Sequence, residues 1–513
     1  MNPQKHLAFW SALLLAVAVL GEPLFIGGSR ECFFDDALLE KEATQATLIV
    51  HHPVLRGPVL RHDAPWEGSG CNYHNFFFDD AWPGYDGMHP NGVYRMYYLG
   101  WQCPSGLPSA PPGHAIVACY AESPDGIHWT KPNLGICSYQ GIRDTNIVVD
   151  NPLLGHEFID NFMVFRDDNP ACPKEQRYKG ISLYHHALWA FYSPDGIIFT
   201  LGNKVASKGV FDSLNVVFWD AIAGKYRGYV RGNHFDPKGR PTDFGGAIRD
   251  INYIESVDFL HWTEPELINF TTDPEDIALY TNCMSPYFRA PRFIIGFPTR
   301  YVERVVWNGS FEQLGGLEKR QARMKLSKRY GTTVTDCIFA VSRNGRDFAR
   351  YMDAFLRPEP ENGENWVYGD CYPALGFAVT PNDRVPGAPD ELSMYLPTNH
   401  FTDNPAELNR YTLRMDGFAS LHAGGHEVTA LTKPFVYEGK DMFMNFETSA
   451  FGYMFITLID EAGNRFPSCE TFGNTTDRKV IFDDAEAVAK LSGKPVRLEF
   501  RMMDADIYSM QFR

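Results

Sequence analysis

Four carboxylates stand in polar, turn-rich stretches next to apolar runs, and they are the residues of this sequence best placed for chemistry. They are Asp63, Glu67, Asp144 and Asp212. Two carboxyl groups held on rigid strands can act on one bond, one as an acid and the other as a base or nucleophile. Three of the four also have a structural alternative: Asp63 as a turn residue, Asp144 as the ion-pair partner of Arg143, and Asp212 as a cap that binds backbone amides.

A short turn motif occurs four times around these carboxylates. Its pattern is Ser-x-(Asp/Asn)-(Gly/Phe)-x-x-(Trp/Phe), and its serines are Ser123, Ser193, Ser256 and Ser342. In such a turn the Asp side chain binds its own backbone and Gly takes a positive φ. An apolar run precedes the motif and the aromatic residue begins the next strand. Repeats of this kind predict sheets arranged as blades, which bury both faces only when they close into a ring.

The order of apolar runs predicts five blades over residues 63–418. Their opening segments are 73–78, 143–149, 211–219, 280–283 and 366–373. After Phe418 the strands follow at a more even spacing, which predicts a β-sandwich over residues 419–513. Residues 22–62 form an N-terminal segment with short strands of their own. The predicted fold is therefore all-β, a five-bladed β-propeller followed by a C-terminal β-sandwich, and an aromatic content of 14% suits it.

The amino terminus predicts export. Residues 7–20 are an apolar run behind Lys5 and His6, too short for a typical membrane span, so we expect residues 1–21 to be a secretory signal. If this signal is cleaved, the mature protein would be secreted or periplasmic, with no membrane contact after cleavage. The alternative is an uncleaved anchor. Ten cysteines permit disulfides, although their spacing does not give a pairing.

The overall charge excludes some partners. Lys and Arg number 47 and Asp and Glu number 63, so the net charge is 47 − 63 = −16. This balance disfavours nucleic acid and anionic membrane surfaces as partners. No motif predicts a metal or an organic cofactor. A structural calcium on the propeller axis stays open, although no loop has the EF-hand spacing. The oligomeric state stays open as well.

Several motifs together resemble a known superfamily. They are Asp63-x-Pro-Trp-Glu-Gly, Tyr120-x-x-Ser-x-Asp-Gly-x-x-Trp, Phe211-Asp-Ser-x-Asn-x-x-Phe-Trp-Asp, Pro298-Thr-Arg-Tyr, Leu413-Arg-Met-Asp-Gly-Phe and Asp504-Ala-Asp-Ile-Tyr. With the blade order, they resemble the five-bladed propeller glycoside hydrolases of families 32 and 43. In particular they resemble exported bacterial proteins described as similar to family 32. The likeness covers residues 63–513.

The resemblance implies an exported glycoside hydrolase that cleaves an oligo- or polysaccharide of plant or algal origin. Such enzymes bring carboxylates from the first three blades into one axial funnel, where an acid protonates the leaving oxygen and a carboxylate serves as nucleophile or base. By position, Asp63 or Glu67 would be the nucleophile or base, Asp144 would bind the sugar, and Asp212 would be the acid. The family usually has Glu at this last position, and the family 32 motif Trp-Met-Asn-Asp-Pro-Asn-Gly is absent. The implied substrate-binding residues are Trp66, His74, Arg143, Asn146, Asn215, Arg300, Tyr372 and His400.

Two other functions are compatible with the same residues. A carbohydrate-binding protein without catalysis would explain Asp212 in place of the usual Glu. A glycoside phosphorylase would need a phosphate site, which Arg143, Arg231 and Arg300 would form if they converged. For most of the binding candidates the structural alternative is packing in the core.

Overall fold

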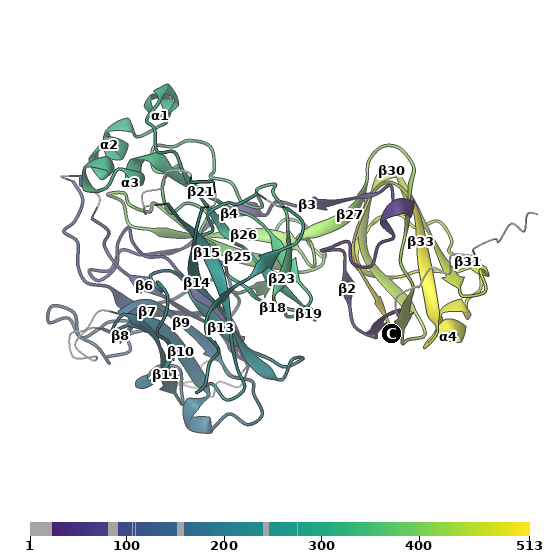
Figure 1. Cartoon of the computed structure of the whole chain (residues 1–513), viewed down its shortest axis with the longest axis horizontal. Coiled ribbons are helices and arrows are strands. Elements are labelled where there is room, and N and C mark those ends of the chain that lie inside the picture. Colours follow the sequence, from purple (N-terminus) through teal and green to yellow (C-terminus); the bar gives the residue numbers. More distant parts are fainter. Residues whose placement is uncertain are drawn as a thin grey trace, which may run out of the picture.

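Five sheets, antiparallel except for one edge strand, form the larger part of the computed structural model, and a second β-domain lies beside them (Figure 1). The structure describes residues 23–80, 91–104, 106–107, 109–150, 159–236, 238–239, 246–273 and 275–513. The predicted signal segment 1–21 lies outside the described residues. No helix within the described ranges is long and apolar enough to span a membrane.

The five sheets are the blades of a propeller, as predicted. Blade 1 contains β5 (Asn75–Asp79), β6 (Val93–Gly100), β7 (Val117–Ser123) and β8 (Ile147–Val149). Blade 2 contains β9 (Ile159–Arg166), β10 (Tyr178–Tyr184), β11 (Ala187–Ser193) and β12 (Thr200–Ala206). Blade 3 contains β13 (Val216–Asp220), β14 (Lys225–Phe235), β15 (Ala247–Ser256) and β16 (Glu266–Leu267).

Blade 4 is the most elaborate. It contains β18 (Ser285–Tyr287), β19 (Ala290–Gly296), β22 (Ala340–Ser342), β23 (Asp347–Arg350) and the edge strand β17 (Asn269–Phe270). A separate hairpin, β20 (Thr299–Glu303) and β21 (Thr333–Cys337), interrupts it. The helices α1 (Gly309–Gln313), α2 (Leu317–Leu326) and α3 (Arg329–Thr332) connect the two strands of this hairpin.

Blade 5 closes the ring with a strand from the other end of the propeller. Its strands are β24 (Ala378–Thr380), β25 (Glu391–Thr398), β26 (Glu407–Arg414) and β4 (Val54–Arg61). β4 pairs antiparallel with β26 from Val54 opposite Thr412 to Arg61 opposite Glu407. The outermost strand of the last blade therefore precedes the first blade in sequence.

The prediction that residues 143–149 open blade 2 is wrong. β8 pairs with β7, with Ile147 opposite Cys119 and Val149 opposite Ala118, so it is the outermost strand of blade 1. β9 is the innermost strand of blade 2. Both strands are almost entirely buried. Apolar content alone therefore could not separate the outer strand from the inner one.

The repeated turn motif holds neighbouring blades together. In its first copy the Asp125 carboxylate accepts the backbone N–H groups of Ile127 and His128, both at 2.8 Å, and the Ser123 hydroxyl accepts that of Gly126 at 2.9 Å. The preceding blade then binds the turn, because Tyr395 on β25 donates to the Gly126 carbonyl. The same contact joins two further pairs of blades. Between blades 1 and 2 the Tyr97 hydroxyl donates to the Gly196 carbonyl at 2.7 Å, and between blades 3 and 4 the Tyr229 hydroxyl donates to the Gly345 carbonyl at 2.8 Å.

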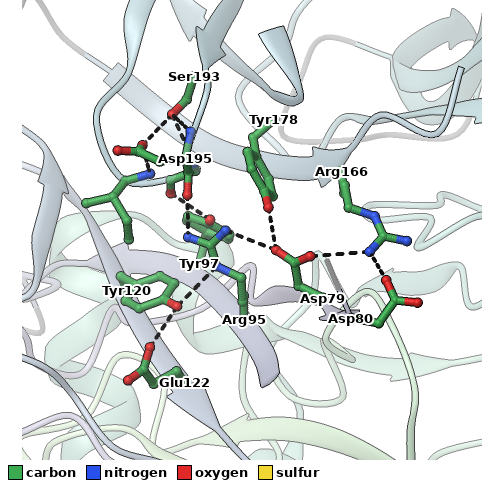
Figure 2. A network of polar contacts seen from close by, with 12 residues as sticks. Asp79, Asp80, Arg95, Tyr97, Tyr120, Glu122, Arg166, Tyr178, Ser193 and Asp195 are labelled. Carbon is green, nitrogen blue, oxygen red and sulfur yellow. Dashed lines mark hydrogen bonds and ion pairs between the residues drawn. The ribbon is translucent and has the colours of Figure 1, made fainter. Parts of the chain in front are cut away.

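A buried ion pair forms a second joint between blades 1 and 2 (Figure 2). Asp79, at the end of β5, lies 3.2 Å from the Arg95 guanidinium of β6, and both side chains are fully buried. Tyr178 of blade 2 donates to the same carboxylate at 2.6 Å. Arg95 in turn donates to the Asp195 carbonyl in the blade 2 turn at 2.9 Å. Blades 2 and 3 repeat the arrangement around Asp167.

The Asp167 joint uses the same chemistry with different residues. The carboxylate pairs with Lys179 of its own blade and accepts the Tyr226 hydroxyl of blade 3 at 2.7 Å. Asp79 and Asp167 are therefore framework residues, because buried charges are tolerated only when they are paired and hydrogen-bonded in this way.

The C-terminal region forms the second β-domain, in which the prediction places a sandwich. Its longest strands, β30 (Met442–Asp460) and β33 (Pro495–Phe512), pair over most of their length. The other C-terminal elements are β27 (Ala419–Ala423), β28 (Val428–Leu431), β29 (Phe435–Tyr437), β31 (Arg465–Pro467), β32 (Asn474–Lys479) and α4 (Ala487–Leu491).

The amino-terminal segment is divided between the two domains. β1 (Leu24–Gly27), β2 (Glu31–Cys32) and β3 (Thr47–Val50) pair with β29, β33 and β27 in turn. Figure 1 shows purple β2 in the right-hand domain with yellow β33, and purple β3 beside light-green β27 where the two domains meet. β4 alone belongs to the propeller. All ten cysteines lie in the described part of the chain, and each is a free thiol there.

Candidate active site

Each blade places one polar or aromatic side chain at or just before its innermost strand. In blade order these are Tyr73, Asp160, Asp212, Tyr280 and Tyr372. The Tyr372 ring stacks against Tyr73 at a centroid distance of 5.9 Å and against Tyr280 at 5.5 Å. Burial, the neighbouring tyrosines and the Asp160 carboxylate together raise the pKa of Tyr73. These residues therefore meet at the propeller axis, and we call them the axial ring.

A buried asparagine recurs close to the start of the innermost strand in blades 1–4, at Asn75, Asn161, Asn215 and Asn282. Asn75 and Asn282 bridge neighbouring blades, whereas Asn215 binds within blade 3 and the Asn161 side chain has no hydrogen-bond partner among the described residues. The Asn282 amide donates to the Leu214 carbonyl of blade 3 at 3.4 Å, while its oxygen accepts the Met284 N–H at 3.0 Å. One side chain thus satisfies backbone groups in two blades, which holds the strand starts in register.

Asn75 gives a direct test of this role. Its amide donates to the Tyr97 and Phe162 carbonyls at 3.2 and 3.1 Å, and its oxygen accepts the Val164 N–H at 2.8 Å. We expect Asn75→Ala to lower the free energy of unfolding by about 2–4 kcal/mol, because buried backbone groups lose their partners. Urea unfolding measures this. Asn133→Ala, at an exposed loop position, should change it by less than about 0.5 kcal/mol, and an equal effect of both would contradict the role.

The backbone is strained at several of these strand starts. Tyr73, Asn161, Cys283 and Cys371 have φ angles of 53°, 59°, 44° and 55°. Residues with side chains seldom adopt this left-handed conformation, which costs on the order of 1–3 kcal/mol each. Such strain clusters at functional sites, where the surrounding structure enforces it. Its recurrence here marks the axial ring as the candidate site.

Asp212 and Arg231 form the charged pair of the ring. The Asp212 carboxylate lies 2.6 Å from the Arg231 guanidinium of β14, and the side chains are 47% and 2% exposed. Asn215 holds the backbone between them, since its oxygen accepts the Arg231 N–H at 3.0 Å. Asp212 is therefore a solvent-accessible carboxylate on a rigid support.

Asp160 has the opposite electrostatic environment. It is half-buried at the start of β9. Burial and the charge of Asp212 raise its pKa to about 7, although the Asn161 N–H and Arg231 oppose the shift. The two carboxyl groups therefore interact, and the protonated form of Asp160 is favoured below about pH 7. An acid and a carboxylate at neighbouring blade starts are the two groups that hydrolysis of a glycosidic bond requires.

The four predicted catalytic residues do not lie together. Only Asp212 belongs to the axial ring. Asp63 is 59% exposed and lies 3.7 Å from both Arg61 and Lys131. Asp144 is an exposed loop residue before the outer strand β8, where Asn133 donates to it at 2.8 Å. The position of Asp144 follows from the corrected blade assignment, because β8 is the outermost strand of blade 1 and not the inner strand of blade 2.

Glu67 belongs to a buried network between blades 1 and 5. Tyr98 donates to its carboxylate at 2.5 Å and Lys131 at 2.8 Å, while His62 lies 3.7 Å away. His62 also contacts the predicted His74 at 3.0 Å. The candidates Trp66 and Asn146 complete the network, with Trp66 donating to Asn146 at 2.8 Å. Glu67, Trp66, His74 and Asn146 thus come together, in the core rather than in the axial ring.

Glu67 should make stability depend on pH. Burial alone would raise its pKa, but His62 and Lys131 outweigh this and lower the pKa to about 2. Because the folded pKa lies below the ordinary value, the stabilisation is present above about pH 4.5 and is lost as the pH falls through about 2. We expect about 3 kcal/mol, of which half is gone near pH 3. Urea unfolding of wild type and Glu67→Gln from pH 6 to 3 tests this, since the variant should lose less stability.

The remaining predicted binding residues have mixed positions. Tyr372 and Asn215 belong to the site as described. His400 is a buried wall residue whose ring lies 6.2 Å from Tyr372, and burial lowers its pKa to about 3. Arg300 lies further out and pairs with Asp336. Arg143 is exposed beside Asp144, so the three arginines expected to bind phosphate do not converge.

Sequence reasoning missed Asp160, Tyr73 and Tyr280. One signal in the sequence could have found Asp160, namely the asparagine shared by the strand starts. His74-Asn75, Asp160-Asn161, Leu214-Asn215 and Thr281-Asn282 have the same register relative to the apolar run that follows. Aligning on this asparagine places Asp160 at the start of blade 2.

Among the described residues, no group of three or more His, Cys, Asp or Glu side chains is arranged to hold a metal ion. This observation does not test the structural calcium on the propeller axis that the sequence left open. The axial ring contains two carboxyl groups, those of Asp160 and Asp212, and Asp212 pairs with Arg231.

Comparison with known proteins gives similarity to solved structures only. No protein-family model matches the chain, and no curated protein matches it significantly. An N-acetylgalactosamine deacetylase from F. plautii is 10% identical, with a TM-score of 0.39, over 88% of this chain and 95% of its own. A glycoside hydrolase family 32 β-fructofuranosidase from Bombyx mori is 8% identical, with a TM-score of 0.37, over 89% and 94%. A protein of glycoside hydrolase family 130 is 12% identical, with a TM-score of 0.40, over 71% of this chain and 94% of its own.

Proposed function

We propose that this protein is a glycoside hydrolase whose catalytic pair is Asp160 and Asp212. The observation that carries the proposal is the pairing of two carboxyl groups in opposite environments at neighbouring blade starts. Asp160 transfers its proton to the glycosidic oxygen as the bond to the anomeric carbon breaks. Asp212 either attacks that carbon or takes a proton from the attacking water. Tyr73, Tyr280 and Tyr372 form the wall around the pair.

The pH dependence of activity tests the acid. Because the pKa of Asp160 is raised to about 7, the acid form is present below that pH and is lost above it. We expect kcat/KM to fall about tenfold per pH unit above roughly 7. Assays from pH 5 to 9 on a cleaved glycan measure this. The fall of kcat/KM above pH 7 should be absent in Asp160→Asn. A wild-type kcat/KM that stays unchanged up to pH 9 would contradict the assignment of Asp160 as the acid.

Substrate screening tests the function itself. We expect release of reducing sugar from one member of a panel of plant and algal oligo- and polysaccharides, in buffer without phosphate. Turnover only with phosphate would favour a phosphorylase, and binding of a glycan that survives intact would favour a non-catalytic lectin-like role. The same proposal includes export, since residues 7–20 are apolar. N-terminal sequencing of the protein recovered outside the cytoplasm should then begin after about residue 21.

A further inference from the structure

A polar cavity lies at the rim of the propeller, where blade 5 meets the C-terminal domain. Its propeller side comes from the outer strands β4 and β26 and from the loop 381–390, and its other side comes from β30, β32 and β33. The cavity has a volume of 730 Å³, which lies within the range of about 300–1,000 Å³ that ligand pockets occupy. We call it the rim cavity. It is separate from the axial ring, because that ring is built at the innermost strands of the blades.

One arginine fixes the wall of the rim cavity. The Arg414 guanidinium of β26 donates to the Glu447 carboxylate of β30 at 3.0 Å. It also donates to the Asn474 side chain and to the Thr475 carbonyl of β32, both at 2.8 Å. Tyr508 of β33 donates to the same Glu447 at 2.8 Å. Because the arginine bonds cross from the propeller to the C-terminal domain, the cavity is already formed without a ligand, which lowers the cost of ordering it on binding.

The charges that line the rim cavity balance one another. Three arginines and three carboxylates contribute to the lining. Arg414 pairs with Glu447 at 3.0 Å, and Arg56 of β4 pairs with Glu391 at 3.1 Å. The third arginine and the third carboxylate are Arg384 and Asp390, which belong to the same loop. The lining has no net charge, so it does not favour an ion of either sign over a neutral ligand.

Arg384 and Asp390 are the charged groups of the lining that remain open. Both residues are exposed, and within the part of the chain that the structure describes their side chains have no hydrogen-bond or ion-pair partner. Thr412 of β26 also lines the cavity, is 2% exposed, and its hydroxyl is without a partner among the same residues. A guanidinium only donates and a carboxylate only accepts. A ligand whose groups do both, namely one with several hydroxyls, matches this set.

The same loop adds apolar surface next to the open groups. Val385 is 55% exposed, and Pro386 and Pro389 line the cavity beside it. Hydroxyl groups around the edge of a ring and C–H groups on its faces are the two kinds of surface that a sugar presents. The loop therefore offers a partner to each of them.

We propose that the rim cavity binds a neutral oligosaccharide chain, whose hydroxyls bridge Arg384 and Asp390 while its ring faces pack on Val385 and the two prolines. This second glycan site uses elements that take no part in the axial ring. The inference rests on the proposed function only for the choice of a glycan among polyhydroxylated ligands. A long glycan held at the rim would be kept at a high effective concentration near the ring, with no change in the chemistry there.

Calorimetric titration of the full-length Asp160→Asn variant tests the rim site, since this variant should leave bound glycans intact. The probes are neutral hexasaccharides of xylose, arabinose, galactose and fructose, with hexagalacturonate as the charged counterpart. We expect one neutral probe to bind with a Kd of about 1 mM or lower. Its Kd should change by less than about twofold when NaCl is raised, because no ion pair forms. Failure of every neutral probe to bind, or tighter binding of hexagalacturonate than of all of them, would overturn the proposal.

A double variant localises the binding. Arg384→Ala with Asp390→Ala removes both open groups and keeps the net charge, and it should raise the Kd of that probe about 10-fold or more. Arg143→Ala with Asp144→Ala is the matched control, because it removes the same two residue types from exposed neighbouring positions outside both sites. It should change the Kd by less than about twofold. Circular dichroism checks the fold of both, and an equal Kd in the two double variants would overturn the rim site.

The rim site and the hydrolase fail in different ways. Binding of a neutral probe that depends on Arg384 and Asp390, with no cleavage of any glycan by the wild type, would keep the rim site and remove the hydrolase. Cleavage of a glycan by the wild type, with binding of every probe unaffected by the two loop substitutions, would remove the rim site and keep the hydrolase.

Discussion

Asp160→Asn and Asp212→Asn are each expected to lower kcat/KM by about 100- to 10,000-fold, the range that positioned acids and bases contribute. The two losses should differ in kind. Without the acid, a substrate whose leaving group is already a good one, such as a dinitrophenyl glycoside, should still be cleaved by Asp160→Asn. The Asp212 variant should lose activity on both kinds of substrate, because no carboxylate remains to attack or to activate water.

The sequence supplies matched controls for this experiment. Asp63→Asn and Asp144→Asn make the same chemical change at exposed carboxylates outside the axial ring. We expect both to keep kcat/KM within about twofold of wild type. Circular dichroism of all four variants checks that the fold is unchanged. Loss of activity in Asp144→Asn with retention in Asp160→Asn would overturn the placement of the catalytic pair.

The largest effect on stability is expected at the joint between blades 1 and 2. Arg95→Met would remove the Asp79 ion-pair partner at 3.2 Å and leave the buried carboxylate with Arg166 alone, at 3.3 Å. Removing one member of a buried pair costs about 3–5 kcal/mol, and we expect a loss near the lower value because Arg166 still compensates part of the charge. Asp79→Asn should cost a similar amount. Guanidinium unfolding followed by tryptophan fluorescence measures the shift.

Asp80 is the natural control, since it is adjacent and also binds an arginine. It pairs with Arg166, but its side chain is 68% exposed (Figure 2). Exposed pairs contribute about 0–1 kcal/mol, so Asp80→Asn should have little effect. The double variant Asp79→Asn with Arg95→Met should cost less than the sum of the two single changes, because neither charge is then left alone. Additive losses would show that the two residues act independently.

Local chemistry made much of the fold predictable. The repeated Ser-x-(Asp/Asn) turns define their own hydrogen bonds, so they located the ends of four blade strands, and apolar runs located the openings of blades 1 and 3. Burial could not rank strands within a blade, because β8 is as buried as β9. The catalytic assignment carried this error with it, and Asp144 took the place that Asp160 holds.

Other features depend on contacts between segments far apart in sequence. The partner of β4 is β26, and no local pattern in either strand specifies the other. The raised pKa of Asp160 likewise depends on its burial and on the charge of Asp212, which belongs to a different blade. Residue types indicated that carboxylates were present, but only the ring geometry showed which two interact.

The divided amino-terminal segment has a consequence for biosynthesis. β1, β2 and β3 pair with strands that are translated last, and β4 must wait for β26 before the ring closes. Strands β1 to β4 are therefore synthesised several hundred residues before their partners. Until those partners are available, these strands keep open edges, which are prone to pair with other chains. A helper that shields those edges during translation would raise the yield of folded protein more than one acting after release.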